Sequence, residues 1–370
     1  MLPNPFKPTA GSRPPELVGR EQQISALIEG IDNGPGAPGR LMIFTGARGV
    51  GKTVMLSEVA EVAMRERGWW AIHDAATPGL VARLSEHVQE ILDANDAPRK
   101  RRITGITLPA NLGGFQTEVV PQQTVSLRRR LGKLLDRIEP QSSGLLITID
   151  EVHSGVADLR ELATLMQFLI REDRQVALVM AGLPSAVSGL LSETVLTFLR
   201  RAERFLLADI YLDEVHDAFV KTIRKHGRDI ETSAAELATE ATFGYPFLIQ
   251  LVGYHIWRQS DDRMITVADV NAGVLAARRR LGALVHETAL ADLSDTDRTF
   301  LVAVAADDGP ARIADIRTRM GDVSAQYVDR YRKRLLSAGM LTQTERGRVD
   351  FALPYLREFL REHAAQYGLA

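Results

Sequence analysis

The sequence contains no cysteine, which excludes disulfide bonds and thiolate metal sites. It also lacks any apolar run of about 18 residues, the length that a membrane-spanning helix needs. Neither sign of charge is in clear excess, since the formal net charge is −2 at pH 7, so the total charge indicates no class of partner. These absences predict a cytoplasmic protein without a membrane partner.

The composition that is present is typical of folded domains. Hydrophobic residues make up 45% and charged residues 25%, which argues against disorder. A length of 370 residues is enough for two or three domains. Proline is concentrated at the start of the chain, where it disfavours both helix and strand. We therefore expect residues 1–14 to form an extended arm.

Short apolar segments then alternate with helical patterns. Strands are expected at residues 41–44, 69–73, 144–149 and 176–180, and helices at residues 53–67 and 80–92. Continuous apolar strands separated by helices indicate a parallel sheet that is covered on both faces. The sequence therefore predicts an α/β core over residues 15–212.

One segment of this core departs from the alternation of strands and helices. Residues 99–124 combine alternating polarity with a Gly-Gly turn, which predicts an inserted β-hairpin. Four basic residues, 99–102, stand at its start. They form either a solvated charge cluster or a contact with a partner or nucleic acid.

The rest of the chain divides into two further units. Residues 213–290 carry four helical patterns and predict an all-α unit. Residues 291–370 predict three helices and a short hairpin that turns at Arg346, which together match a winged helix-turn-helix. Ser324 is placed to cap the third of these helices.

A phosphate-binding motif follows the first expected strand. The segment GARGVGKT fits the P-loop pattern GxxxxGK[ST], whose backbone N–H groups and helix N-terminus hold a phosphate chain. Lys52 would reach the β and γ phosphates of ATP, and the Thr53 hydroxyl would bind Mg²⁺. The residues expected around the phosphates are Gly46, Ala47, Arg48, Gly49, Val50, Gly51, Lys52 and Thr53.

An acidic pair, Asp150 and Glu151, ends the expected strand at residues 144–149. A carboxylate at a strand end opposite a P-loop is suited to the Mg²⁺ shell, which we assign to Asp150. Glu151 would then polarise the attacking water. The alternative for the pair is an ordinary acidic junction between strand and loop.

Hydrolysis also requires positive charge at the transition state. Three arginines, Arg200, Arg201 and Arg204, are close together near the end of the core. One of them is a candidate arginine finger that acts on a neighbouring subunit, which would require a homo-oligomer. The alternative is a basic helix face.

The third helix of the winged unit carries side chains that suit DNA. Arginine and glutamine read base edges and lysine suits phosphates, and the wing adds two more arginines. The candidate DNA contacts are Gln326, Arg330, Lys333, Arg334, Arg346 and Arg348. Acidic and basic residues are balanced in this unit, so docking on another protein or within the chain stays open.

With these motifs, the chain resembles the AAA+/STAND P-loop ATPases, and its domain order resembles the origin-recognition and archaeal initiator ATPases. The resemblance implies that the all-α unit is a lid, and that Val18, Gly19 and Arg20, which match the family's box before the first helix, lie beside the adenine. Gly244-Tyr245-Pro246 looks like the GxP motif, whose proline, Pro246, approaches the nucleotide.

Two departures from the initiator pattern bear on the rate of turnover. The lid has no arginine in the GxxR arrangement, and the fourth strand ends without a clear asparagine or threonine. These departures favour a slow ATPase that binds ATP or ADP with Mg²⁺ and acts as a switch on DNA through its winged helix. The alternatives are a signalling switch whose winged helix docks on protein, and a nucleotide-binding scaffold without hydrolysis.

Overall fold

The computed structural model describes residues 2–9, 11–96 and 127–363. The expected hairpin at residues 99–124 and the basic run at residues 99–102 lie outside the described residues. Within the described part, no helix is both long and apolar enough to cross a membrane.

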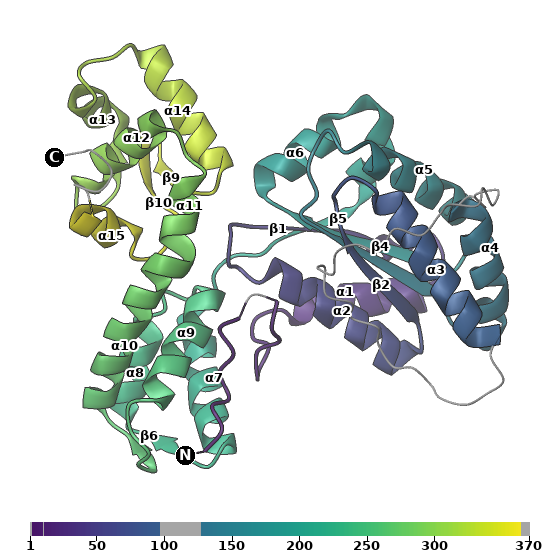
Figure 1. Ribbon diagram of the computed structural model, residues 1–370, viewed down its shortest axis with the longest axis horizontal. Coiled ribbons are helices and arrows are strands. Elements are labelled where there is room, and N and C mark those ends of the chain that lie inside the picture. The colour runs from purple at the N-terminus through teal and green to yellow at the C-terminus, as the bar shows by residue number, and fades with distance from the viewer. Residues whose placement is uncertain (1, 10, 97–126, 364–370) are drawn as a thin grey trace, which may run out of the picture.

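A five-stranded parallel sheet forms the centre of the core, with strand order β2-β3-β4-β1-β5 (Figure 1). Its central strands are buried on both faces, which is why they read as continuous apolar runs. The α/β prediction is therefore confirmed. The strands are β1 (Leu41–Thr45), β2 (Trp70–Ala75), β3 (Leu145–Asp150), β4 (Val176–Gly182) and β5 (Glu203–Leu206).

Helices cover both faces of this sheet. Alternate residues of β1 show the division, because Met42 and Phe44 pack on the side of α1 and α2, while Ile43 packs on the side of α3 to α6. The helices on the first side are α1 (Glu21–Asp32) and α2 (Lys52–Arg67). Those on the second side are α3 (Leu80–Asp96), α4 (Leu127–Ile138), α5 (Ala157–Arg171) and α6 (Pro184–Ser192). Short 3₁₀ turns span Pro38–Arg40, Glu139–Gln141 and Thr194–Arg201.

The lid is helical as expected, apart from one small pair of strands. Its helices are α7 (Leu212–Lys225), α8 (Thr232–Glu240), α9 (Pro246–Trp257) and α10 (Val267–Leu281). Two-residue strands, β6 (Asp229–Ile230) and β7 (Met264–Ile265), pair in parallel where the chain enters α8 and α10. The expectation of a purely helical unit missed them, because two residues are too few to show a strand pattern.

A continuous helical segment leads from the lid to the last unit (Figure 1). After α10 comes a π-helical turn, Gly282–His286, and then α11 (Glu287–Ala291). The last unit contains α12 (Asp295–Ala305), β8 (Ala311–Arg312), α13 (Ile313–Arg319), α14 (Ala325–Ser337), β9 (Leu341–Glu345), β10 (Arg348–Phe351) and α15 (Leu356–His363).

This arrangement confirms the winged helix-turn-helix. Helices α12, α13 and α14 precede the hairpin of β9 and β10, and β8 adds a third strand to give the order β8-β10-β9. Ser324 caps α14 as expected, since its hydroxyl accepts a hydrogen bond of 3.2 Å from the backbone N–H of Tyr327.

Candidate nucleotide-binding site

The glycine-rich loop joins β1 to the N-terminus of α2 at the carboxyl edge of the sheet. Gly49 and Gly51 adopt positive φ angles of 76° and 89°, which L side chains rarely adopt. Gly49 is also enclosed, since a Cβ there would overlap the Tyr245 hydroxyl. The loop therefore needs glycine both for its backbone shape and for the approach of the lid.

Lys52 and Thr53 are the first residues of α2, directly after the glycine-rich loop. Lys52 Nζ donates hydrogen bonds to the carbonyl oxygens of Gly46 at 3.0 Å and Ala47 at 2.7 Å, within the loop. Burial lowers the pKa of Lys52, and the carboxylate of Asp150 opposes this shift. Burial thus destabilises the charged form of Lys52, and an anion bound beside it would stabilise that form.

Asp150 lies at the end of β3, beside the same loop. The Thr53 hydroxyl donates a hydrogen bond of 2.5 Å to Asp150 Oδ2, so these two expected metal ligands are brought together. No group of three or more His, Cys, Asp or Glu side chains in the described part could hold a metal ion alone. A hydroxyl and a carboxylate fit Mg²⁺, which keeps waters and takes phosphate oxygens as its remaining ligands.

Glu151 has an unusual backbone conformation for a glutamate. Its φ is 55°, and its N–H donates a hydrogen bond of 2.8 Å to Asp150 Oδ1. A left-handed non-glycine residue costs conformational energy and is often found at functional sites. The turn directs the chain away from β3 and leaves the Glu151 side chain exposed at the edge where the phosphate loop lies.

Arg20 connects three parts of the site. Its guanidinium is buried and donates hydrogen bonds to the carbonyl oxygens of Ala208 at 2.7 Å and Val50 at 3.4 Å. Gly19, with a φ of 65°, lies close to Ile210 at the entry to the lid. The structure therefore brings Gly19 and Arg20 close to the phosphate loop and to the core–lid junction. That Val18, Gly19 and Arg20 lie beside the adenine stays a prediction.

The lid rests directly on the phosphate loop through Tyr245. This side chain is 1% exposed, and its hydroxyl donates a hydrogen bond of 2.9 Å to the carbonyl oxygen of Arg48. Burial raises the pKa of Tyr245, so the hydroxyl keeps its proton and donates. Pro246 is the first residue of α9. No sequence pattern indicates this role of Tyr245, although the residue stands between Gly244 and Pro246 of the GxP-like motif.

The candidate arginine fingers do not share one position. Arg200 and Arg204 line a hollow together with Thr45, the last residue of β1, and Arg200 Nε donates a hydrogen bond of 2.9 Å to the carbonyl oxygen of Leu191. Arg201 does not line this hollow. Two of the three arginines therefore share a hollow that reaches Thr45 at the end of β1.

The candidate DNA contacts separate into two groups. Arg334 pairs with buried Asp297, Lys333 pairs with Asp329, and Arg348 donates to the carbonyl oxygen of Pro310. Arg330 lies over the rings of Tyr327 and Tyr331 at 5.6 and 5.0 Å. Within the described residues, Gln326 and Arg346 are exposed and their side chains make no hydrogen bond or ion pair.

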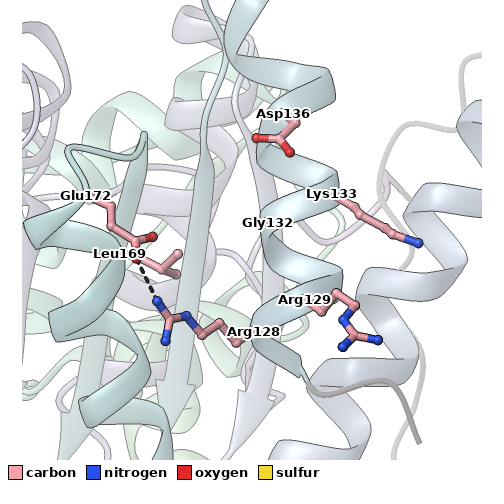
Figure 2. Close-up of a pocket in the computed structure, with 7 residues that line it drawn as sticks. All are labelled: Arg128, Arg129, Gly132, Lys133, Asp136, Leu169 and Glu172. Atoms are coloured by element: carbon pink, nitrogen blue, oxygen red, sulfur yellow. Dashed lines mark hydrogen bonds and ion pairs between the residues drawn. The ribbon is translucent and has the colours of Figure 1, made fainter. Parts of the chain in front are cut away.

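Another hollow, between α4 and α5, does not have the features of a ligand site. Arg128 pairs with Glu172 at 2.7 Å across it. Figure 2 shows Arg129 and Lys133 pointing to the opposite side of α4, away from that pair. Its charged groups do not converge on one point, so the phosphate loop is the better candidate.

Comparisons with known proteins agree with this assignment. Residues 16–181 match the family described as AAA ATPase domain. This match includes the glycine-rich loop and Asp150 and covers most of the core, so the core is similar to an AAA ATPase domain. Residues 283–360 match a second family, described as Domain of unknown function (DUF8462). A search of the curated proteins finds no match.

Solved structures resemble this chain over nearly its whole length. The Walker-type ATPase PABY2304 of Pyrococcus abyssi is 16% identical, with a TM-score of 0.66 over 94% of this chain and 97% of that one. The ORC2 protein of Aeropyrum pernix, in ADPNP–ADP complexes, is 14% identical, with a TM-score of 0.61 over 98% of each chain. At these identities the likeness shows the fold, which is that of AAA+ ATPases resembling origin-recognition proteins.

Proposed function

We propose that the protein binds Mg-ATP, hydrolyses it slowly and acts as a nucleotide-dependent switch on DNA through its winged helix. The observation that carries this proposal is the contact between the winged helix and the phosphate loop. Arg48 in the loop lies 3.4 Å from the carboxylate of Asp292, at the start of the winged unit. A Cβ on Gly339, just after α14, would lie 3.9 Å from Cα of Ala47.

The nucleotide would be held by residues of the phosphate loop, of the segment before α1 and of the lid. Residues 46–51 would supply backbone N–H groups, Lys52 would pair with the β and γ phosphates, and Val18, Gly19, Arg20 and Pro246 would enclose the base and sugar. Thr53 and Asp150 would hold Mg²⁺, which neutralises phosphate charge when bound. Glu151 would orient and polarise the attacking water.

Slow turnover is supported by the end of β4. The residues there are Ala181, Gly182 and Leu183, none of which has a polar side chain to offer the γ-phosphate. The next hydroxyl, that of Ser185, instead donates a hydrogen bond of 2.6 Å to the carbonyl oxygen of Ser337, the last residue of α14. The first hydroxyl after β4 thus contacts the winged helix.

Through these contacts, ATP binding at the loop would affect the position of α14, the proposed DNA-reading helix. Bound phosphates would attract Arg48 and weaken its pairing with Asp292. The affinity of α14 for DNA would then depend on the nucleotide, because the last turn of α14 is docked on α6 through Ser185. The exposed side chains of Gln326 and Arg346 are the best candidates for contacts with base and backbone.

A second function is favoured by the charges of α14 itself. Lys333, Arg332 and Arg334 all pair with carboxylates within the winged unit. Side chains that are paired with carboxylates are less available to DNA phosphates. The end of α14 already contacts α6 of the same chain, so its surface is also suited to contact with a protein partner. A signalling switch that acts on a protein partner is therefore the alternative.

The test is DNA binding by fluorescence anisotropy, with ATP, ADP or no nucleotide, across a salt series. We expect the double variant Gln326→Ala/Arg346→Ala to bind more weakly and with a shallower salt dependence, by about 0.9 in the log–log slope for each DNA phosphate that the protein no longer neutralises. Arg279→Ala, on the exposed face of α10, is the matched control. No binding at low salt in any nucleotide state would favour the protein-docking switch.

A further inference from the structure

The N-terminal arm is fixed along the lid. Phe6 is 2% exposed and packs against Phe219 at 5.7 Å between ring centroids. Asn4 Nδ2 donates a hydrogen bond of 2.9 Å to the carbonyl oxygen of Tyr254, and the N–H of Lys7 donates one of 3.1 Å to Gln250 Oε1. Residues 2–9 therefore follow α9 and α7 (Figure 1).

The arm then crosses to the helix that follows the phosphate loop. Gly11 has a φ of 74°, and a Cβ on it would lie 3.7 Å from Cγ2 of Thr53. The chain thus passes directly over the residue proposed to bind Mg²⁺.

Arg13 attaches the arm to α2 through two acidic residues. Its guanidinium contacts Glu58 Oε1 at 2.8 Å and Glu61 Oε2 at 2.5 Å. The Glu58 side chain is only 6% exposed, and its other oxygen, Oε2, has no hydrogen-bond partner. A carboxylate so little solvated depends on a nearby cation, so Arg13 holds the arm on α2 more firmly than an exposed pair would.

The chain returns to the lid three residues later. Glu16 pairs with Lys221 at 3.0 Å and with Lys225 at 3.4 Å, both on α7. These pairs hold the pKa of the Glu16 carboxyl below its usual range. Residues 11–16 are thus held by charge to α2 at one end and to the lid at the other, across the nucleotide site.

We propose that residues 11–16 form a strap over the phosphate and metal end of the nucleotide site, and that release of this strap controls nucleotide exchange. Arg13 is the positioning residue. Separation of the lid from α2 must break the ion pairs that join the strap to α2 and to α7, so these pairs would slow any nucleotide exit that requires this movement. The inference rests on the nucleotide-binding part of the proposed function and not on DNA.

The experiment measures dissociation of a fluorescent ADP analogue, mant-ADP, after rapid mixing with excess ADP. We expect Arg13→Gln to release it about tenfold faster, since the change removes one exposed and one largely buried ion pair. Glu61→Gln, which leaves the Glu58 pair, should speed release less. Arg13→Lys should restore most of the wild-type rate because it keeps the charge.

A matched control lies on the same helix. Arg67 joins the end of α2 to Asp32 of α1 at 2.7 Å, away from the arm, and Arg67→Gln should leave the release rate unchanged. Release from the wild type should also accelerate between about 0.05 and 0.5 M salt, because screening weakens exposed pairs, while Arg13→Gln should depend on salt far less. If Arg13→Gln acted only by loosening overall packing, Arg67→Gln would also change the release rate of mant-ADP.

A second readout follows the strap itself. Because the chain has no cysteine, Ser12→Cys introduces a single thiol next to Arg13. Its reaction with a thiol reagent should be slower with ADP bound, and Arg13→Gln should remove that protection. Release from Arg13→Gln at the wild-type rate would overturn the strap alone, whereas failure of the wild type to bind mant-ADP would overturn the strap and the nucleotide site together.

Discussion

Among single side chains, Glu151 gives the clearest test of turnover. Glu151→Gln keeps the size of the side chain but removes the charge that would polarise water, so we expect hydrolysis to fall by about 10²–10⁴-fold. ATP affinity should be unchanged, because Lys52 and the loop remain. Phosphate release and mant-ATP binding, measured on wild type and variant, check both expectations. Equally negligible turnover in the two proteins would indicate a nucleotide-binding scaffold.

The sequence alone was enough to nominate Lys52, Thr53 and Asp150, because their motifs are local. Lys52 and Thr53 are defined by the glycines just before them, and Asp150 by the strand that it ends. Tyr245 and Arg13 could not be found in the same way. Tyr245 contacts a carbonyl oxygen 197 positions away, and Arg13 reaches carboxylates 45 and 48 positions away, so both roles exist only once the chain has folded.

The π-helical turn between lid and winged helix contains a buried titratable group. His286 is 1% exposed, its Nε2–H donates to the carbonyl oxygen of Pro354 at 2.9 Å, and its ring lies 5.1 Å from that of Phe359. Burial lowers the pKa of His286 from 6.5 to about 4, although the hydrogen bond to Pro354 opposes this shift. Protonation therefore disfavours the packed turn.

The sign of the pH effect follows from that lowered pKa. The unfolded chain binds the proton more readily, so His286 causes no loss of stability above pH 6.5, and the loss grows as pH falls from 6.5 to about 4. We expect a total of about 3 kcal/mol from this group. Urea unfolding at several pH values should show a flatter profile for His286→Phe than for wild type. His153→Phe, at an exposed position, is the control, and equal profiles would contradict the prediction.

At the start of α12, a capping box is joined to α14 by an ion pair. Asp297 is fully buried and accepts hydrogen bonds from the N–H and hydroxyl of Ser294, and Arg334 supplies its cation. Arg334→Ala would leave this carboxylate uncompensated, so we expect the winged helix to lose about 2 kcal/mol of stability. Lys333→Ala, whose pair with Asp329 is exposed, should change stability by less than about 0.5 kcal/mol.

Unfolding in urea checks this difference between neighbouring residues. If Arg334→Ala is as stable as the wild type, Arg334 is free to contact DNA. The ion pair with Asp297 gives Arg334 a structural role that the composition of α14 does not indicate. Residue type indicates which side chains can read DNA, but only the packing of α12 on α14 shows that Arg334 already has a partner.

The order of the three units follows from local sequence patterns, but their contacts with one another do not. Strand periodicity predicted the core, helical periodicity the lid, and the hairpin the winged helix, because each pattern is complete within its own segment. The contacts from Ser185 to Ser337 and from Arg48 to Asp292 join positions 152 and 244 residues apart. Such contacts depend on how the units pack, which no short pattern records.

The pairing of Arg48 with Asp292 gives a prediction for movement between these units. Phosphates bound by the loop compete for Arg48, so ATP should loosen the winged helix from the core. In a chain without native cysteine, dyes placed through Ser192→Cys and Thr344→Cys would report this as a fall in energy transfer. Asp292→Ala should lower transfer without nucleotide and reduce the ATP-dependent change by about half or more.

Asp295→Ala is the control for this experiment, because Asp295 is 99% exposed and pairs with Arg298 of its own helix. A ligand shifts a conformational equilibrium only if it binds the two states with different affinity. Energy transfer in the wild type that does not change with nucleotide would therefore contradict a switch. Transfer that responds to ATP in the wild type but not in Asp292→Ala would make Arg48 the link between the phosphates and α14. The nucleotide dependence of DNA binding should then disappear in the same variant.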